Sequence, residues 1–347
     1  MFRSLFRNAF QAISTLVIVL TAFSFFSPYV NPATFRWFSF FGTVFPWLLL
    51  VNILLMTFWI WYTNRFALYH LAIIILGWGY VAKFMGTYTG KSQAPRNSVT
   101  IVTHNLGLLF YGKKVNEAQT DSIAGAYAAF LKKNGVPDII CTQETRGTFY
   151  PLLGKYLGYD QRFNLKKGTV ILSRFPIKAG GEVSFGKTSN STLWANIELP
   201  GGKIVRVYNV HLQSNKVTKD AEKVIEDPQN LDEISKVMNK VGGATSIRAE
   251  QAERLREHIL DCPYPVIICG DFNDTPNSFV YHHIGDGLTD TFEERGFGVG
   301  STFAGSLPLL RIDYILIDPG FQTYQCRVVR DNTWSDHYPV WATMGGE

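Results

Sequence analysis

Three long apolar stretches open the chain, and a pattern of short β-branched runs follows them. Residues 9–27 and 37–62 contain no charged residue, and residues 66–82 form a third uncharged run that only His70 interrupts. A helix that crosses a bilayer needs about 20 apolar residues, so the first two stretches are long enough and the third is slightly short. We predict a transmembrane region at residues 1–86, with helices near 9–27, 37–62 and 66–85.

Aromatic residues support this prediction, because Trp and Tyr gather near the ends of the second and third stretches, as they do at membrane interfaces. A cleaved signal peptide would explain the first stretch alone, but not three in series. The basic residues that flank the stretches are divided between the two sides, so the positive-inside rule gives no orientation. We expect a multi-pass membrane protein, and the sequence leaves open which side of the membrane holds its C-terminal part.

The rest of the chain has the pattern of a sheet-rich α/β domain. Residues 87–98 are polar and rich in turn-forming residues, which predicts a linker. From residue 99 to residue 347, β-branched runs that predict strands alternate with amphipathic runs that predict helices. The predicted strands are 98–105, 138–142, 170–177, 203–210, 265–269, 311–317 and 335–341, and the predicted helices are 117–134 and 248–260.

Residues 214–244 differ from their surroundings, because they are rich in Lys, Asp and Glu. We expect a helix near 231–240 that ends at the pair Gly242–Gly243. Two interpretations stay open. The segment is either a solvated surface helix, or a lid or membrane-facing insertion beside the site.

Charge is spread unevenly along the chain. Of the 33 basic residues, seven precede residue 97, and all 28 acidic residues follow it, so the C-terminal part holds 26 basic against 28 acidic residues. Nucleic-acid binders usually present a basic face, since phosphate neutralisation supplies much of their affinity. The near-neutral balance disfavours such a partner but leaves room for a local basic patch. The four cysteines lack metal-type spacing, and Cys141 and Cys269 lie in apolar runs that predict burial.

The stretch from Pro265 to Pro276 combines an apolar run with polar side chains. Its sequence is Pro-Val-Ile-Ile-Cys-Gly-Asp-Phe-Asn-Asp-Thr-Pro. The apolar residues before Gly270 predict a buried strand. Asp271 and Asn273 follow two residues apart, so both side chains can face the same way. A carboxylate beside an amide is able to activate water and hold a phosphoryl oxygen, but this stretch alone also fits an ordinary polar turn.

Other polar residues fall where predicted strands end, namely Asn105, Glu144, His211 and the pair Asp336–His337. Taken singly, each fits a turn cap, a surface carboxylate or a hydrogen-bonded core histidine. Combined with Asp271, they supply oxygen ligands for a hard divalent cation and two imidazoles. We therefore expect a functional site along one edge of the sheet.

Six blocks in order resemble the endonuclease/exonuclease/phosphatase family, and the resemblance covers about residues 97–347. It implies an α/β (α+β) four-layered sandwich of two packed β-sheets flanked by helices, and a phosphoric ester hydrolase that needs Mg²⁺, or Mn²⁺ in its place. The blocks are Thr103-His-Asn-Leu-Gly107, Gln143-Glu144, Asn209-Val-His-Leu212, Gly270-Asp-Phe-Asn273, Arg311-Ile-Asp-Tyr314 and Ser335-Asp-His-Tyr-Pro339.

The resemblance implies a metal-binding set and one departure from it. Glu144 would be the main Mg²⁺ ligand, helped by Asn105 and Asp336. Abasic-site endonucleases carry an extra acidic residue just after the first-strand Asn, where this chain has Leu106-Gly107. The departure argues against a second acidic ligand on that strand and against an abasic-site endonuclease.

The resemblance also implies catalytic roles. Asp271 would orient and deprotonate the attacking water, and Asn273 would hold a phosphoryl oxygen. His337 would face the phosphate in an orientation fixed by Asp313, since a carboxylate sets the tautomer and charge of an imidazole. His211 would contact the phosphate from the other side.

The sequence thus predicts a membrane-anchored, Mg²⁺-dependent phosphoesterase that cleaves a phosphodiester or phosphomonoester by in-line attack of water. A lipid or inositol-phosphate head group fits the membrane tether, and a nucleic acid fits His211. No protein partner is inferred. A non-catalytic scaffold with the same fold predicts loss of the metal-binding and water-activating residues, and none is lost. A transporter predicts acidic residues in the spans, and they contain none.

Overall fold

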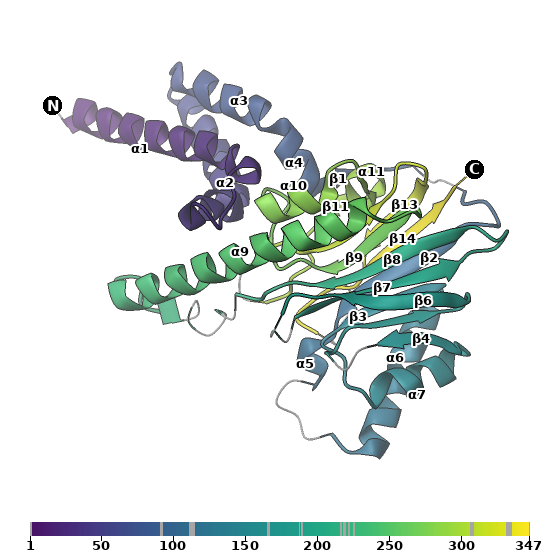
Figure 1. Ribbon diagram of the computed structural model, residues 1–347. Helices are drawn as coiled ribbons and strands as arrows, with labels where there is room; N and C mark the ends of the chain where they lie inside the picture. The colour runs from purple at the N-terminus through teal and green to yellow at the C-terminus, as the bar shows by residue number, and fades with distance from the viewer. Residues whose placement is uncertain are drawn as a thin grey trace.

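A group of apolar helices lies beside a domain of two packed sheets (Figure 1). The computed structural model describes residues 2–90, 93–110, 115–164, 167–186, 188, 190–215, 217, 220, 223–224, 226–305, 309–330 and 335–346. The two sheets pack face to face and helices cover their outer faces, so the predicted four-layered sandwich is confirmed.

The N-terminal region contains α1 (Phe2–Ser24), η1 (Ser27–Tyr29), η2 (Arg36–Phe38), α2 (Ser39–Trp61), α3 (Phe66–Leu76) and α4 (Trp78–Phe84). Two stretches, Ser4–Tyr29 and Arg36–Trp61, are long and apolar enough to cross a membrane. The predicted third helix is broken, because α3 and α4 meet at Gly77 with a bend of 62°. A side chain at Gly77 would come within 2.8 Å of the Phe25 ring. The region therefore holds two such helices, or three if the bent pair forms one span.

Buried polar side chains link these helices to one another. Asn52 on α2 donates to Thr21 Oγ1 at 2.8 Å, and its Oδ1 lies 2.8 Å from His70 Nδ1 on α3. Trp59 Nε1 donates to Ser14 Oγ at 2.8 Å. In an apolar environment an unpaired polar group is costly, so these bonds favour one arrangement of the helices.

Six strands form the first sheet, in the order β13-β14-β2-β3-β5-β4. Their bounds are β2 (Val99–Asn105), β3 (Ile139–Gln143), β4 (Gln161–Asn164), β5 (Val170–Ser173), β13 (Gln322–Val328) and β14 (Val340–Gly345). Only β2 and β3 run parallel within it, so both reach the same edge with their carboxyl ends.

The second sheet has the order β10-β12-β9-β8-β7-β6. Its strands are β6 (Ile177–Val183), β7 (Ser191–Glu198), β8 (Ile204–His211), β9 (Val266–Asp271), β10 (Thr289–Asp290) and β12 (Asp313–Ile317). Here β8 and β9 are the parallel pair. A third, two-stranded sheet joins β1 (Met85–Thr87) to β11 (Phe297–Val299), and it fastens the start of the predicted linker to the domain. Linker residues 91 and 92 lie outside the described residues.

Apolar side chains fill the space between the sheets and under the helices. The central layer joins β-branched residues of both sheets and contains Cys141 and Cys269, which are buried and free, as their apolar runs predict. Helices α6 (Glu117–Lys133) and α7 (Phe149–Leu157) cover the first sheet, and α9 (Leu231–Leu260) and α10 (Phe279–Gly285) cover the second. The short helices α5 (Gly107–Phe110) and α11 (Thr291–Arg295) complete the domain.

The prediction that Gly242–Gly243 ends a helix is wrong, because α9 runs unbroken through both glycines. A side chain at Gly242 would lie 3.3 Å from Arg36 Cδ of η2, so the glycine allows close contact with the N-terminal region. Glycine weakens a helix by only about 1 kcal/mol, which packing offsets. Figure 1 shows the N-terminal half of α9 projecting beyond the sheets on the side of α1 and α2. Part of the predicted insertion, at 216, 218–219, 221–222 and 225, lies outside the described residues.

Candidate active site

The strand register brings the predicted site residues to one edge of the two sheets. In the first sheet Asn105 is paired with Gln143, the residue before Glu144. In the second sheet Asp271 is paired with His211 on one side and with Asp313 on the other. The two strands of each parallel pair run in the same direction, so their carboxyl ends lie at the same edge. The short antiparallel strand β12 begins at that edge.

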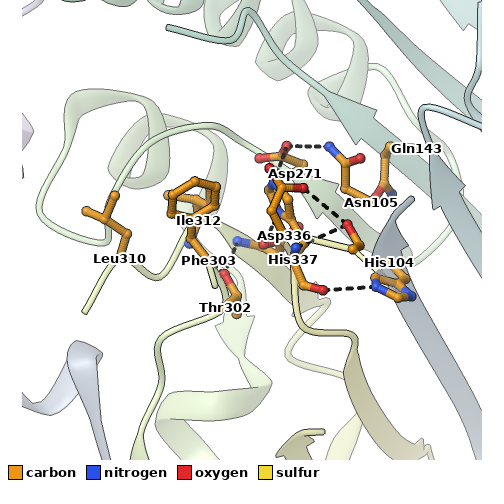
Figure 2. Close-up of polar contacts among 12 residues, drawn as sticks. His104, Asn105, Gln143, Asp271, Thr302, Phe303, Leu310, Ile312, Asp336 and His337 are labelled. Carbon is orange, nitrogen blue, oxygen red and sulfur yellow. Dashed lines mark hydrogen bonds and ion pairs between the residues drawn. The ribbon is translucent and has the colours of Figure 1, made fainter. Parts of the chain in front are cut away.

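Asn105 joins the two sheets at this edge. Its Nδ2 donates to Asp271 Oδ2 at 2.9 Å (Figure 2) and to Glu144 Oε1 at 3.2 Å. Glu144 has a φ of 54°, a left-handed conformation that is uncommon outside glycine. Such a conformation persists only where the surroundings hold it, and it occurs often at functional sites.

Asp271 and Asn273 are joined by two hydrogen bonds at the end of β9. The backbone N–H of Asn273 donates to Asp271 Oδ1 at 2.8 Å, and Asn273 Nδ2 donates to Asp271 Oδ2 at 3.0 Å. Asn273 Nδ2 also donates to the carbonyl of Leu212 at 3.1 Å, and its φ is 54°. Burial raises the pKa of Asp271 to about 6, while the nearby imidazoles lower it. Asp271 is therefore mostly ionised at neutral pH and still basic enough to accept a proton.

His337 is held by a carboxylate on its far side. Its Nδ1 donates to Asp313 Oδ2 at 2.9 Å, and its Nε2 lies 3.8 Å from Asp271 Oδ2. Burial alone would lower the pKa of His337, but the carboxylates of Asp313 and Asp271 raise it to about 10. His337 is therefore an imidazolium at neutral pH, with its Nε2–H on the Asp271 side.

Asp271, Asp313 and His337 also offer ligand atoms that lie within 4.8 Å of one another, as metal ligands do. A protonated imidazole has no lone pair for a metal, and Nδ1 is used in the bond to Asp313. We therefore interpret this cluster as a hydrogen-bonded Asp313–His337 pair next to the carboxylate of Asp271.

His211 lies beside Glu144, with its Nε2 3.5 Å from Glu144 Oε1. The side chain is buried, and within the described residues neither ring nitrogen forms a hydrogen bond. An unsatisfied buried ring nitrogen is costly, so His211 is available for a ligand that approaches Glu144.

Asp336 is not joined to the other two predicted metal ligands. Its Oδ1 accepts from Ser335 Oγ at 3.3 Å, and across the described part of the chain no hydrogen bond or ion pair connects it to Glu144 or Asn105. The residue nevertheless precedes His337 directly, and its charge contributes to the raised pKa of that imidazole.

The donors around Glu144 suit a divalent cation. The side-chain oxygens of Glu144 and Asn105 are hard donors, the kind that Mg²⁺ prefers. The Glu144 side chain is 40% exposed, so an ion can reach it from solvent. Gly107 gives a second indication, because a Cβ there would lie 2.4 Å from Glu144 Oε2 and 3.3 Å from Asn105 Oδ1. Gly107, part of the Leu106-Gly107 departure from the family pattern, thus leaves open space for the carboxylate of Glu144. An acidic side chain at Gly107 would displace that carboxylate.

Several residues that no sequence pattern marks hold the site residues in place. His104 donates from Nε2 to the carbonyl of His337 at 3.0 Å (Figure 2), and its Nδ1 accepts from Tyr127 Oη at 2.8 Å. Burial lowers the pKa of His104 to about 3, so it is neutral. Thr302 Oγ1 accepts from the backbone N–H of Asp313 at 3.1 Å. His104 lies next to Asn105, but only the long-range packing reveals its partner.

A second group of this kind ties the sheets together under the site. Gln143 Nε2 donates to Asn209 Oδ1 at 2.6 Å and to Thr103 Oγ1 at 3.0 Å. Asn209 Nδ2 in turn donates to the carbonyls of Thr142 and Val170. These side chains connect β3 with β8, and this connection accounts for the buried amides Gln143 and Asn209 in the second and third sequence blocks.

The two-sheet sandwich and its edge cluster of carboxylates, amides and imidazoles define a phosphoesterase fold. Residues 113–337 match the model of the Endonuclease/Exonuclease/phosphatase family, and the chain belongs to this family. Its members are phosphoesterases and nucleases that generally depend on a divalent metal, so the chain is a phosphoric ester hydrolase by family. Residues 7–84 match a second model, a domain of unknown function, DUF8431. No curated protein matches the chain.

Solved structures share the fold of the catalytic domain. A family member from Bacteroides thetaiotaomicron is 19% identical, with a TM-score of 0.53, over 74% of this chain and 99% of that one. A mannosyl-6-phosphatase from the same organism is 20% identical, with a TM-score of 0.50, over 72% and 100%. TDP2 from D. rerio, complexed with a single-strand DNA product, is 18% identical, with a TM-score of 0.51, over 72% and 99%. Identities this low establish the fold alone.

Proposed function

We propose that the protein is a membrane-anchored, Mg²⁺-dependent phosphoesterase whose site is formed by Asn105, Glu144, His211, Asp271, Asn273, Asp313 and His337. The observation that supports it most is the Asp271 carboxylate, which lies between the amide of Asn105 at 2.9 Å and the imidazolium of His337 at 3.8 Å. A general base and a fixed positive charge are what hydrolysis at phosphorus requires.

In this proposal Asp271 accepts a proton from water as the oxygen attacks phosphorus. The new P–O bond forms opposite the ester P–O bond that breaks, and the leaving ester oxygen takes up a proton from solvent to become the alcohol. Asn273 Nδ2 donates to Asp271 and to the carbonyl of Leu212, so Asn273 would hold a phosphoryl oxygen through Nδ2 in place of its bond to Leu212. His337 presents a positive charge to the developing negative charge, and Asp313 keeps that charge in place.

Glu144 and Asn105 would hold the Mg²⁺, or Mn²⁺ in its place. Bound there, the ion would neutralise charge on a phosphoryl oxygen. His211, with both ring nitrogens available, would bind an oxygen on the Glu144 side. Asp336 completes the proposed ligand set through its carboxylate, after a change of rotamer from the one that accepts from Ser335.

A phosphate ester carried by a lipid is the substrate class that we favour. The apolar N-terminal helices suit an anchor in a bilayer, and the loop that follows Asn273 contacts those helices directly. The catalytic domain is nearly neutral, with 26 basic and 28 acidic residues after residue 96. A nucleic-acid substrate is the second candidate.

The test is a substrate panel with the purified full chain in lipid nanodiscs. The panel holds sphingomyelin, phosphatidylinositol phosphates, plasmid DNA and an aryl phosphodiester, each with Mg²⁺ and with EDTA. We expect Mg²⁺-dependent release of product from a phospholipid. Cleavage of DNA alone would favour the second candidate, and no hydrolysis of any ester with either Mg²⁺ or Mn²⁺ would contradict the proposal.

A further inference from the structure

The loop that follows the catalytic pair runs directly into contact with the N-terminal helices. Thr275 Oγ1 donates to the carbonyl of Gly42 on α2 at 3.4 Å. Asn277 Nδ2 donates to the carbonyl of Ser24, the last residue of α1, at 3.1 Å. Both loop side chains are buried. These contacts join residues more than two hundred positions apart, and they lie within a few residues of Asn273.

The contact at Gly42 leaves no room for a side chain. A Cβ at this position would lie 2.1 Å from the backbone carbonyl oxygen of Asn277 and 2.3 Å from Ser27 Oγ. Real Cβ atoms do not come so close to a backbone atom, so any larger residue must push the loop away from α2. Glycine is therefore required here for close approach of two backbones.

A second catalytic strand is held by the same region. The buried Arg311, two residues before Asp313, donates from Nη1 to the carbonyl of Lys83 near the end of α4 at 2.7 Å. Tyr314 Oη lies 2.7 Å from the carbonyl of Arg311 and 2.8 Å from that of Asp274. This hydroxyl connects the approach to β12 with the loop after β9, so the two strand ends that carry the site share one support.

Helix α9 supplies a third connection. Its buried Arg248 pairs with Asp274, with Nε 3.2 Å from Oδ2. On either side of Arg248, Ser246 Oγ donates to the carbonyl of Pro32 at 3.0 Å and Glu253 Oε1 accepts from Asn31 Nδ2 at 2.6 Å. Asn31 and Pro32, which follow α1, thus contact the same helix whose Arg248 pairs with Asp274, the residue after Asn273.

We propose that the N-terminal helices form part of the support of the active site, and that Gly42 and Asn277 act as positioning residues for Asp271 and Asn273. The proposal rests on the proposed function for its kinetic consequence. Asn273 keeps a left-handed φ of 54° and aims its backbone N–H at Asp271. Such a conformation depends on its surroundings, so a shift of the loop at Asn277 alters the pair that activates water.

The same contacts connect the packing of the N-terminal helices to the geometry of the site. The ends of α1, α2 and α4 all touch elements that carry site residues. A change in how these helices pack against one another therefore reaches the site through the backbone. The N-terminal region thus acts on the rate of the reaction as well as on the location of the enzyme.

Two glycines make a matched pair for the test. Gly42→Ala places a methyl group against Asn277, whereas Gly79→Ala, on α4, places one where no other heavy atom lies within 4 Å. Asn277→Ala removes the bond to Ser24 without adding bulk, so it carries the test even if Gly42→Ala does not assemble. All three are made in the full chain in nanodiscs.

Hydrogen–deuterium exchange of the peptide that covers residues 272–281 is measured first, because it needs no substrate. We expect about tenfold faster exchange in Gly42→Ala and Asn277→Ala, and exchange like the wild type in Gly79→Ala. Hydrolysis of the aryl phosphodiester is measured next. We expect kcat to fall by about tenfold or more, since a misplacement of about 1 Å costs up to about 10²-fold, with KM changed by less than about twofold.

Unchanged exchange and kcat in both junction variants would overturn the proposal. An equal effect of Gly79→Ala would also overturn it, because any disturbance of the helices would then suffice. Faster loop exchange with an unchanged kcat would show contact without positioning, and it would overturn the kinetic claim. If the wild type hydrolyses no ester, the proposed function fails, and the exchange result still decides whether the junction holds the loop.

Discussion

Replacing Asp313 with Asn is the sharpest perturbation of the proposed site. Asp313 accepts from His337 Nδ1 at 2.9 Å, and both side chains are buried. Asparagine has nearly the same shape and keeps an oxygen able to accept the hydrogen bond, but it carries no charge. The variant therefore isolates the electrostatic role of the carboxylate.

The magnitude follows from the pKa of His337, which the buried carboxylates raise from 6.5 to about 10. A change of that size corresponds to roughly 5 kcal/mol in favour of the imidazolium. Asp313 is the largest of the causes that raise this pKa, so its loss removes a large share of this stabilisation. The pKa of His337 then falls toward neutral, and burial lowers it further. We expect the rate at about pH 8 to fall by about 10²-fold, the scale for loss of one charge-stabilising group.

The assay is a pH–rate profile of kcat for the wild type and the variant. The wild type should lose activity as the pH falls through about 6, where Asp271 becomes protonated, and as the pH rises through about 10, where His337 loses its proton. In Asp313→Asn the alkaline limb should move toward neutral pH. Asp138→Asn is the control, since Asp138 pairs with the half-exposed Arg174 away from the site. An unchanged alkaline limb in Asp313→Asn would refute the assigned role of His337.

Three further variants test the metal site and the sheet connection. Glu144→Gln should raise the Mg²⁺ concentration for half-maximal rate by about tenfold or more, and an unchanged Mg²⁺ titration would remove Glu144 from the ligand set. Gly107→Ala should do the same, because its Cβ would lie 2.4 Å from Glu144 Oε2; isothermal titration with Mn²⁺ measures this, and wild-type affinity would contradict it. Gln143→Leu should lower the free energy of unfolding by about 1–3 kcal/mol, since it leaves the buried Asn209 Oδ1 without a donor; an unchanged denaturant midpoint would argue against a stabilising link.

Within the described residues of the domain, local sequence patterns predict the strands β2, β3, β5, β8, β9, β12 and β14, the helix α6 and parts of α9, but they miss the other strands and the short helices. β2, β3 and β9 are runs of β-branched residues that end in polar side chains, and the structure places them close to the predicted bounds. The predicted strand 170–177 is wrong, because the structure divides it between β5 in the first sheet and β6 in the second, and the predicted strand 335–341 begins only at Val340, as β14. Two other errors concern glycine. Gly242 lies inside α9 where the helix passes Arg36, and Gly77 lies at a bend where the Phe25 ring packs. In each case a contact with a distant element, which no local pattern contains, decides the conformation.

The grouping of the candidate site residues could be predicted because they fall at strand ends, where side chains are presented at a sheet edge. Their supports could not. His104 binds the carbonyl of His337, and Asn277 binds that of Ser24, across more than two hundred positions in each case. The sequence neighbours of these two residues do not indicate which carbonyl each of them binds. Hydrogen bonds to backbone carbonyls depend on where the chain folds back, and that is known only once the layers are assembled.

The most direct test of the central claim is hydrolysis of an aryl phosphodiester in ¹⁸O-labelled water by the full chain, with Mg²⁺, compared with Asp271→Ala and His337→Ala. The account predicts that the wild type places ¹⁸O in the phosphoryl product. It also predicts that each variant, while folded, loses about 10²-fold or more in rate. Wild-type rates in both variants, or label in the alcohol, would contradict attack of water on phosphorus at this site.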